Sequence, residues 1–115
     1  MGFGKQLRKI REAKRKQDPK YSLRKVAERI RFQQTYLSKV EREGVAPSDD
    51  LLIALAKDLE INETVLFAMA GKVSKRLQSY IIRRPEVFEQ LMETMDKEPD
   101  HSILRIVRQV RDGEW

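Results

Sequence analysis

Apolar residues recur at intervals of three and four along most of the chain, which is the spacing of one face of an α-helix. In residues 1–71 this pattern predicts five helices: one from Phe3 to about Lys16, one after Ser22, one after Gln33, one after Ser48 and one after Asn62. The strict alternation of apolar and polar residues that is typical of a half-buried strand does not occur. We therefore expect an all-α fold.

Residues that start or stop helices stand between these segments. Pro19 ends the first helix because it lacks a backbone N–H and cannot continue the hydrogen-bond ladder. Ser22 is a good N-cap for the second helix, and Gln33 can cap the third. Gly71 suits the left-handed position that follows the last residue of the fifth helix. The predicted helices therefore have physical boundaries as well as apolar faces.

Residues 72–115 predict about three more helices, with Pro85 at the first position of the second and Pro99 just before the third. We expect two domains, residues 1–71 and 72–115. The second carries many bulky apolar residues for so short a segment. These residues need a covering partner, which is either a second copy of the chain, the first five helices or another protein.

The net charge differs in sign between residues 1–46 and residues 47–115. The 115 residues carry a net charge of +6. Residues 1–46 hold fourteen Lys and Arg against five Asp and Glu, a balance of +9, whereas residues 47–115 hold ten against thirteen, a balance of −3. A basic half of this kind favours a polyanionic partner, nucleic acid before membrane.

The second and third helices are separated only by residues 31–32, and two short helices joined so closely must cross steeply. The segment SLRKVAERIRFQQTYLSKVER, residues 22–42, resembles the helix-turn-helix of the lambda repressor and Cro family, also called the XRE family. The resemblance continues through PSDDLLIALAKDLEINETVLF to about residue 70. It implies a five-helix, lambda-repressor-like DNA-binding domain, followed here by the three C-terminal helices.

The resemblance also implies which side chains meet double-stranded DNA. The third helix would lie in the major groove, where a Gln amide can bind adenine bidentately. The expected base-reading residues are Gln33, Gln34, Thr35, Ser38 and Lys39. The expected phosphate contacts are Ser22, Arg24, Lys25, Tyr36 and Arg42. For each of them the alternative is a solvated polar surface, and for Tyr36 it is burial with only the hydroxyl exposed.

Two further positions follow from the family pattern. Arg11 and Glu41 match residues that form a structural salt bridge between the first helix and the recognition helix. Arg31 stands in the turn where the family commonly has Gly. It implies strain of about 1 kcal/mol or an altered turn, because a left-handed backbone crowds a Cβ atom.

The function we expect is a sequence-specific transcriptional regulator, a dimeric repressor whose homodimer forms through residues 72–115. The alternative is a protein-interaction module, such as an antitoxin or a bridging factor, that acts mainly through the C-terminal helices.

No enzyme is expected, because the only histidine is His101 and no cysteine, Gly-rich phosphate loop or nucleophile elbow accompanies it. For the same reason we expect no metal site and no cofactor. The longest apolar run, LLIALA at residues 51–56, is far shorter than the ~20 residues that span a bilayer. We therefore expect a cytoplasmic protein without a membrane partner.

Overall fold

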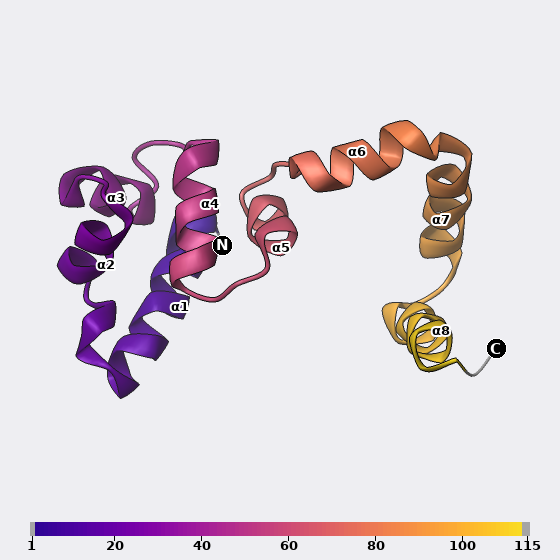
Figure 1. Ribbon diagram of the computed structural model, residues 1–115, viewed down its shortest axis with the longest axis horizontal. Coiled ribbons are helices and arrows are strands. Elements are labelled where there is room, and N and C mark those ends of the chain that lie inside the picture. Colours follow the sequence, from indigo (N-terminus) through magenta and orange to yellow (C-terminus); the bar gives the residue numbers. More distant parts are fainter. Residues whose placement is uncertain (1, 114–115) are drawn as a thin grey trace. The chain divides into compact units, whose positions relative to one another are not determined.

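The computed structural model describes residues 2–113, and all regular elements in that range are helices (Figure 1). The expected all-α fold is confirmed. The chain divides into two compact units, residues 1–74 and 75–115. None of the helices in residues 2–113 is long and apolar enough to cross a membrane.

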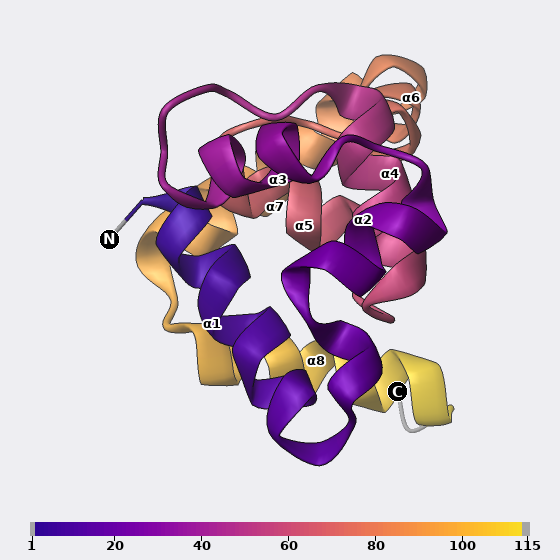
Figure 2. The same ribbon diagram turned by 90° about the vertical axis from the view of Figure 1, so that its left-hand side faces the viewer.

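The first unit contains five α-helices and one short 3-10 helix. In chain order these are α1 (Phe3–Gln17), the 3-10 helix η1 (Pro19–Tyr21), α2 (Leu23–Ile30), α3 (Gln34–Glu41), α4 (Asp49–Asp58) and α5 (Glu63–Met69). The break at Pro19 is present, and it forms η1, in which the Asp18 carboxylate accepts a hydrogen bond from the Lys20 N–H at 3.0 Å. Figure 2 shows α2 and α3 at the front of this unit, joined by a short turn.

Three N-cap side chains of this unit make capping hydrogen bonds, including the expected one of Ser22. The hydroxyl of Ser22 accepts from the N–H of Lys25, the hydroxyl of Ser48 from that of Leu51, and the amide of Asn62 from that of Val65. Gln33 is different, because it occupies the N-cap position of α3 with extended backbone but its side chain makes no capping bond. The amide of Gln33 is therefore not used to start the helix.

The core of the first unit is made of aliphatic side chains from all five α-helices. Leu7 of α1, Val26 of α2 and Leu37 of α3 have no exposed surface. The other fully buried leucines come from α4, from its C-cap residue and from α5: Leu51, Leu52, Leu55, Leu59 and Leu66. Each buried side chain of this size contributes about 1.5–3 kcal/mol. This core fixes α3 against α1 and α2 through one face only, so that its other face is open to solvent.

Three of these helices are followed by a non-glycine residue in the left-handed conformation. Arg31, Glu43 and Glu60 have φ of 62°, 64° and 57°. At Arg31 the N–H donates to the carbonyl of Glu28, and the next N–H, of Phe32, donates to that of Ala27. These two bonds form a Schellman motif, the usual left-handed end of a helix. The turn between α2 and α3 therefore has the left-handed backbone that usually favours Gly, although Arg occupies the position.

A close backbone approach joins α1 to the end of α3. A Cβ atom added at Gly4 would lie 2.4 Å from the carbonyl oxygen of Val40 and 2.6 Å from that of Glu41. No side chain fits at these distances, because both neighbours are backbone atoms. Glycine at position 4 thus allows α1 to hold the C-terminal end of α3.

The second unit contains α6 (Lys75–Arg83), α7 (Pro85–Lys97) and α8 (Asp100–Asp112). Pro85 occupies the first position of α7, where its missing N–H costs nothing. None of the three helices has a buried residue. Large apolar side chains are instead exposed along them: Ile81, Ile82, Val87, Leu91, Met92, Met95, Leu104, Ile106, Val107 and Val110.

Candidate nucleic-acid interface

The open face of α3 carries most of the side chains expected to read bases. Leu37, Val40 and Glu41 are buried, and the residues between them on the helix face solvent. Four expected base-reading residues and one expected phosphate contact line a single shallow cleft of about 400 Å³, with Leu23 of α2 on its other wall: Gln34, Thr35, Ser38, Lys39 and Arg42. The fold therefore brings polar side chains with both donors and acceptors together on one surface.

Gln33 lies just before this surface, exposed at the N-cap position of α3. It does not line the cleft with Gln34. Because its amide makes no capping bond, both its donor and its acceptor are available to a ligand. Ser38, one turn further along, is half-buried, whereas Gln34, Thr35 and Lys39 are exposed.

Three of the expected phosphate contacts lie at the N-terminal end of α2. The Ser22 hydroxyl accepts from the Lys25 N–H at 3.3 Å, and its own proton remains available to an acceptor. Arg24 is exposed and lies 3.7 Å from Glu28, an ion pair in solvent that constrains it little. The positive end of the α2 dipole favours an anion at the same place.

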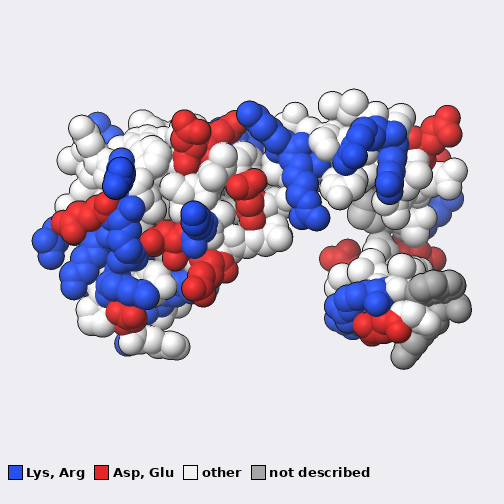
Figure 3. Space-filling model, in the orientation of Figure 1, with Lys and Arg blue, Asp and Glu red and all other residues white. Residues whose placement is uncertain are grey.

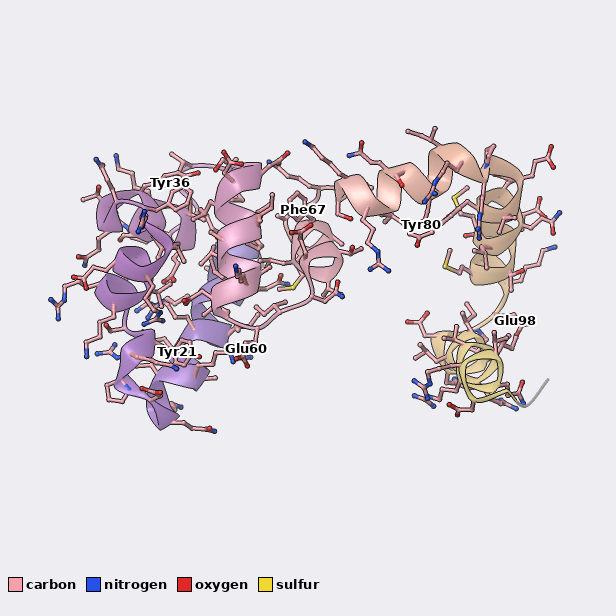
Figure 4. All side chains as sticks on the ribbon, viewed as in Figure 1. Tyr21, Tyr36, Glu60, Phe67, Tyr80 and Glu98 are labelled. Carbon is pink, nitrogen blue, oxygen red and sulfur yellow. The ribbon has the colours of Figure 1, made fainter. Side chains whose placement is uncertain are left out.

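Tyr36 lies apart from these residues, on the side of α3 that faces α4 (Figure 4). It is half-buried, and its hydroxyl accepts a hydrogen bond from the backbone N–H of Ser48 at 3.0 Å. The ring of Phe32 lies 6.0 Å from its own ring. Tyr36 thus connects α3 to the start of α4. Its hydroxyl proton can still be donated to a phosphate.

A buried ion pair fixes α3 to α1. Arg11 Nε donates to Glu41 Oε2 at 2.7 Å and Arg11 Nη2 to Glu41 Oε1 at 2.8 Å, with exposed fractions of 3% and 5% for the two residues. The pKa of Arg11 is raised above its ordinary value, mainly by this hydrogen bond to Glu41, against the opposing effect of burial. Arg11 Nη1 also donates to the carbonyl of Tyr21 at 3.2 Å. One guanidinium therefore positions α1, η1 and α3 together.

A second cleft lies beside this ion pair, and its lining includes Arg8 and Arg15, which are not among the expected DNA contacts. Arg8, Arg15 and Arg42 line it with Glu12, Leu23, Ser38 and the Arg11–Glu41 pair, in a volume of about 340 Å³. Arg8 and Arg15 come from α1 and are seven residues apart, which is two helical turns. That spacing was readable in the sequence, but only the packing of α1 against α3 brings the two arginines to Arg42.

Basic side chains also gather around η1 and the adjoining parts of α1 and α2 (Figure 3). Lys14, Lys20 and Arg29 each lie 5.3 Å from the centre of the Tyr21 ring. Arg29 is further held by Asp58, whose carboxylate it meets at 2.8 and 3.0 Å, and this hydrogen bond is the main cause of the raised pKa of Arg29. The basic segment after α1 is therefore an ordered cluster around one aromatic ring.

Comparison with known proteins agrees with this geometry. The family model described as helix-turn-helix, HTH_3, matches residues 7–66, which is more than half of the chain and extends from α1 into α5. No curated protein and no solved structure matches the chain significantly. The chain belongs to the helix-turn-helix family of the XRE and lambda repressor type, whose members are DNA-binding regulators.

Proposed function

We propose that the protein is a dimeric repressor that binds an operator in double-stranded DNA, with α3 in the major groove. The observation that carries the proposal is the open face of α3, where exposed Gln34, Thr35 and Lys39 share a surface with Arg42. The major groove admits one α-helix and presents a distinct pattern of donors and acceptors for each base pair. A helix with uncommitted amides at its N-terminal end suits that pattern.

Base reading is assigned to Gln33, Gln34, Thr35, Ser38 and Lys39. The amide of Gln can bind N6 and N7 of adenine together, and a pair of this kind discriminates by about 1–3 kcal/mol. Gln33 and Gln34 support this role because neither amide makes a hydrogen bond among the residues that the structure describes. The hydroxyls of Thr35 and Ser38 are less selective, since they can pair with several base edges.

Phosphate binding is assigned to Ser22, Arg24, Lys25, Tyr36 and Arg42, to which the second cleft adds Arg8 and Arg15. Contacts to phosphates fix the position of the protein on the duplex but carry no sequence information. The cleft residues suit this role because four arginines and two glutamates line one hollow beside α3, which leaves an excess of positive charge there. We expect these contacts to make binding strongly dependent on salt.

Repression would be steric, because a protein bound at an operator occludes polymerase. Two copies would bind two half-sites about one turn of DNA apart, roughly 34 Å, held together through residues 72–115. The exposed apolar side chains of α6, α7 and α8 support this assignment, because the described part of the second unit buries none of them within itself.

Selection of bound sites from random DNA tests this function directly. We expect a two-fold symmetric site whose half-sites contain adenine where Gln33 or Gln34 meets the groove. An enriched site without symmetry would contradict the dimer. Retention of DNA without any enriched sequence would contradict base reading by α3.

The variant Gln34→Ala tests the assignment at one position. Loss of the amide should cost about 1–3 kcal/mol at one base pair of each half-site and relax the preference there, while leaving the other positions intact. Gln17→Ala, an exposed glutamine at the end of α1, is the matched control and should select the same site as the unmodified protein. An unchanged preference in Gln34→Ala would remove Gln34 from the base-reading set.

A further inference from the structure

Residues 14–25, which join α1 to α2, carry more positive charge than nearby carboxylates offset. They hold six Lys and Arg against one acidic residue, Asp18. Two of the six form ion pairs with a glutamate of their own helix, and Lys20 lies 3.8 Å from Asp18, an exposed pair that contributes little. The other three have no ion-pair partner in the described part of the chain: Lys14, Lys16 and Lys25. An anion from outside the chain would therefore meet uncompensated charge here.

Two of these cations are held close together at the ring of Tyr21. Lys14 Nζ and Lys20 Nζ each lie 5.3 Å from the ring centre, so the two ammonium groups are at most about 11 Å apart, twice that distance. Phosphates of one DNA strand follow one another about every 3.4 Å along the axis of the duplex. The spacing of the two ammonium groups therefore suits phosphates of one strand that are up to three positions apart.

Hydrogen bonds fix the backbone of η1 beneath these lysines. The carbonyl of Tyr21 accepts from Arg11 Nη1 at 3.2 Å, and that of Lys20 accepts from Arg29 Nη1. Arg11 also binds Glu41 of α3, so one guanidinium positions both η1 and α3. Because the backbone around the lysines is already ordered, less conformational entropy is lost when they bind a phosphate.

The charges contributed by α4 disfavour an anion on one side of this cluster. Arg29 also lies 5.3 Å from the ring centre of Tyr21, but its guanidinium is bound to both carboxylate oxygens of Asp58. Asp58, Glu60 and Lys57 line the hollow between η1, α2 and α4, where two carboxylates stand against one lysine of α4. A phosphate is therefore better placed where η1 continues into the N-terminal end of α2.

The N-terminal end of α2 connects the cluster to the proposed DNA-binding surface. Ser22, an assigned phosphate contact, directly follows Tyr21, and Lys14 directly precedes Arg15, which lines the second cleft with Arg42. Figures 1 and 2 show η1, α2 and α3 along the same side of the first unit. The basic surface is thus continuous from the C-terminal end of α3 to η1.

We propose that Lys14 and Lys20 bind phosphates of one DNA strand at the edge of the half-site, beyond the base pairs read by α3. The eight residues of α2 make it about 12 Å long, and η1 and Gln34 adjoin its opposite ends. That length corresponds to about three or four phosphates of one strand. The inference rests on the proposed function, because the anion is the DNA that α3 holds.

The salt dependence of binding to duplex DNA of mixed sequence tests these two contacts in the full-length chain. Each phosphate contact contributes about 0.9 to the slope of log K against log salt concentration. Lys14→Gln/Lys20→Gln should therefore reduce the magnitude of the slope by about 1.8. Each single variant should reduce it by about half as much, which keeps the test decisive if the double variant does not fold. Lys14→Arg/Lys20→Arg keeps both charges and should retain the slope.

The matched control is Lys9→Gln/Lys16→Gln, which removes two exposed charges from α1 on the side opposite the buried Leu7. It should leave the slope unchanged. An unchanged slope in Lys14→Gln/Lys20→Gln, or an equal reduction in the control, would mean that the cluster at η1 holds no phosphate although the protein binds DNA. If the unmodified chain binds no duplex, the proposed function is wrong as well.

Neutral phosphates locate the contact once site selection has given an operator. Methylphosphonates placed just outside the half-site should weaken binding of the unmodified protein several-fold and leave that of Lys14→Gln/Lys20→Gln unaffected. If only the phosphates within the base pairs read by α3 are sensitive to this replacement, the contact is not at the edge of the half-site and the inference is wrong.

Discussion

Arg31 shows at the scale of one residue how the turn between α2 and α3 is maintained without glycine. Its φ of 62° lies in the left-handed region, where a Cβ atom crowds the backbone. From the sequence, Arg31 is compatible with either backbone strain or an altered turn at this position. The Schellman hydrogen bonds of Arg31 and Phe32 keep the turn, so the conformation is retained with its strain.

We therefore predict that Arg31→Gly stabilises the first unit. Relief of the left-handed strain exceeds the extra entropy that glycine gains in the unfolded chain, for a net increase of about 0.5–1 kcal/mol in the free energy of unfolding. Urea denaturation of the variant and the unmodified protein measures the difference. Arg31→Ala keeps the Cβ atom and loses only the charge, so it should not be stabilised. Equal stability of the glycine and alanine variants would argue against strain.

The Arg11–Glu41 pair is a second feature that one residue can disrupt. Arg11→Met should lower the free energy of unfolding by about 3–5 kcal/mol, because it leaves the buried carboxylate of Glu41 without its partner. The double variant Arg11→Met/Glu41→Met removes both charges and should recover most of that loss. Chemical denaturation of both variants is the measurement. A double variant as unstable as Arg11→Met would mean that packing around the pair, and not charge, is decisive.

At the scale of an element, α3 shows what a sequence can and cannot predict. Apolar spacing correctly placed Leu37 and Val40 inside, and therefore the polar residues of α3 outside. Propensity suggested that Gln33 would cap the helix, but its side chain does not. The position of Arg8 in one cleft with Arg42 could not be predicted, because it depends on packing between α1 and α3, which no local pattern in α1 encodes.

The proposed position of α3 in the major groove predicts the effect of removing a cation at its C-terminal end. Arg42→Ala should weaken binding to all DNA sequences alike and reduce the slope of log K against log salt concentration by about 1, since one phosphate contact is lost. Lys57→Ala on α4 removes the same charge away from both clefts and should leave the slope unchanged. A loss confined to one DNA sequence would instead make Arg42 a base-reading residue.

At the scale of the whole molecule, the excess of basic residues and the exposed apolar helices lie in different parts of the chain. The basic excess of residues 1–46 falls within the first unit, and the exposed apolar helices form the second. Composition alone showed that these residues need a partner, but it could not identify one.

Removal of the second unit tests whether that unit forms the dimer while the first unit recognises the DNA sequence. A chain ending at Ser74 keeps that buried residue and its hydroxyl bond to Thr64, at 3.0 Å, within the first unit. We expect this chain to fold, to be monomeric, and to bind a two-fold operator weakly while retaining the base preferences of a half-site. Sedimentation and operator titration measure both properties. A truncated chain that still dimerises would transfer the interface to residues 1–74.

The left-handed residues that end α2 and α4 have a consequence for tolerance to heat. Replacement by glycine does not suit Glu43, because its side chain lies against Gly2 and Gly4. Arg31 and Glu60 are both exposed and left-handed. In a domain of this size each kcal/mol raises the melting temperature by about 4–8 °C. Glycine at both positions should therefore raise the melting temperature of the same fold by several degrees.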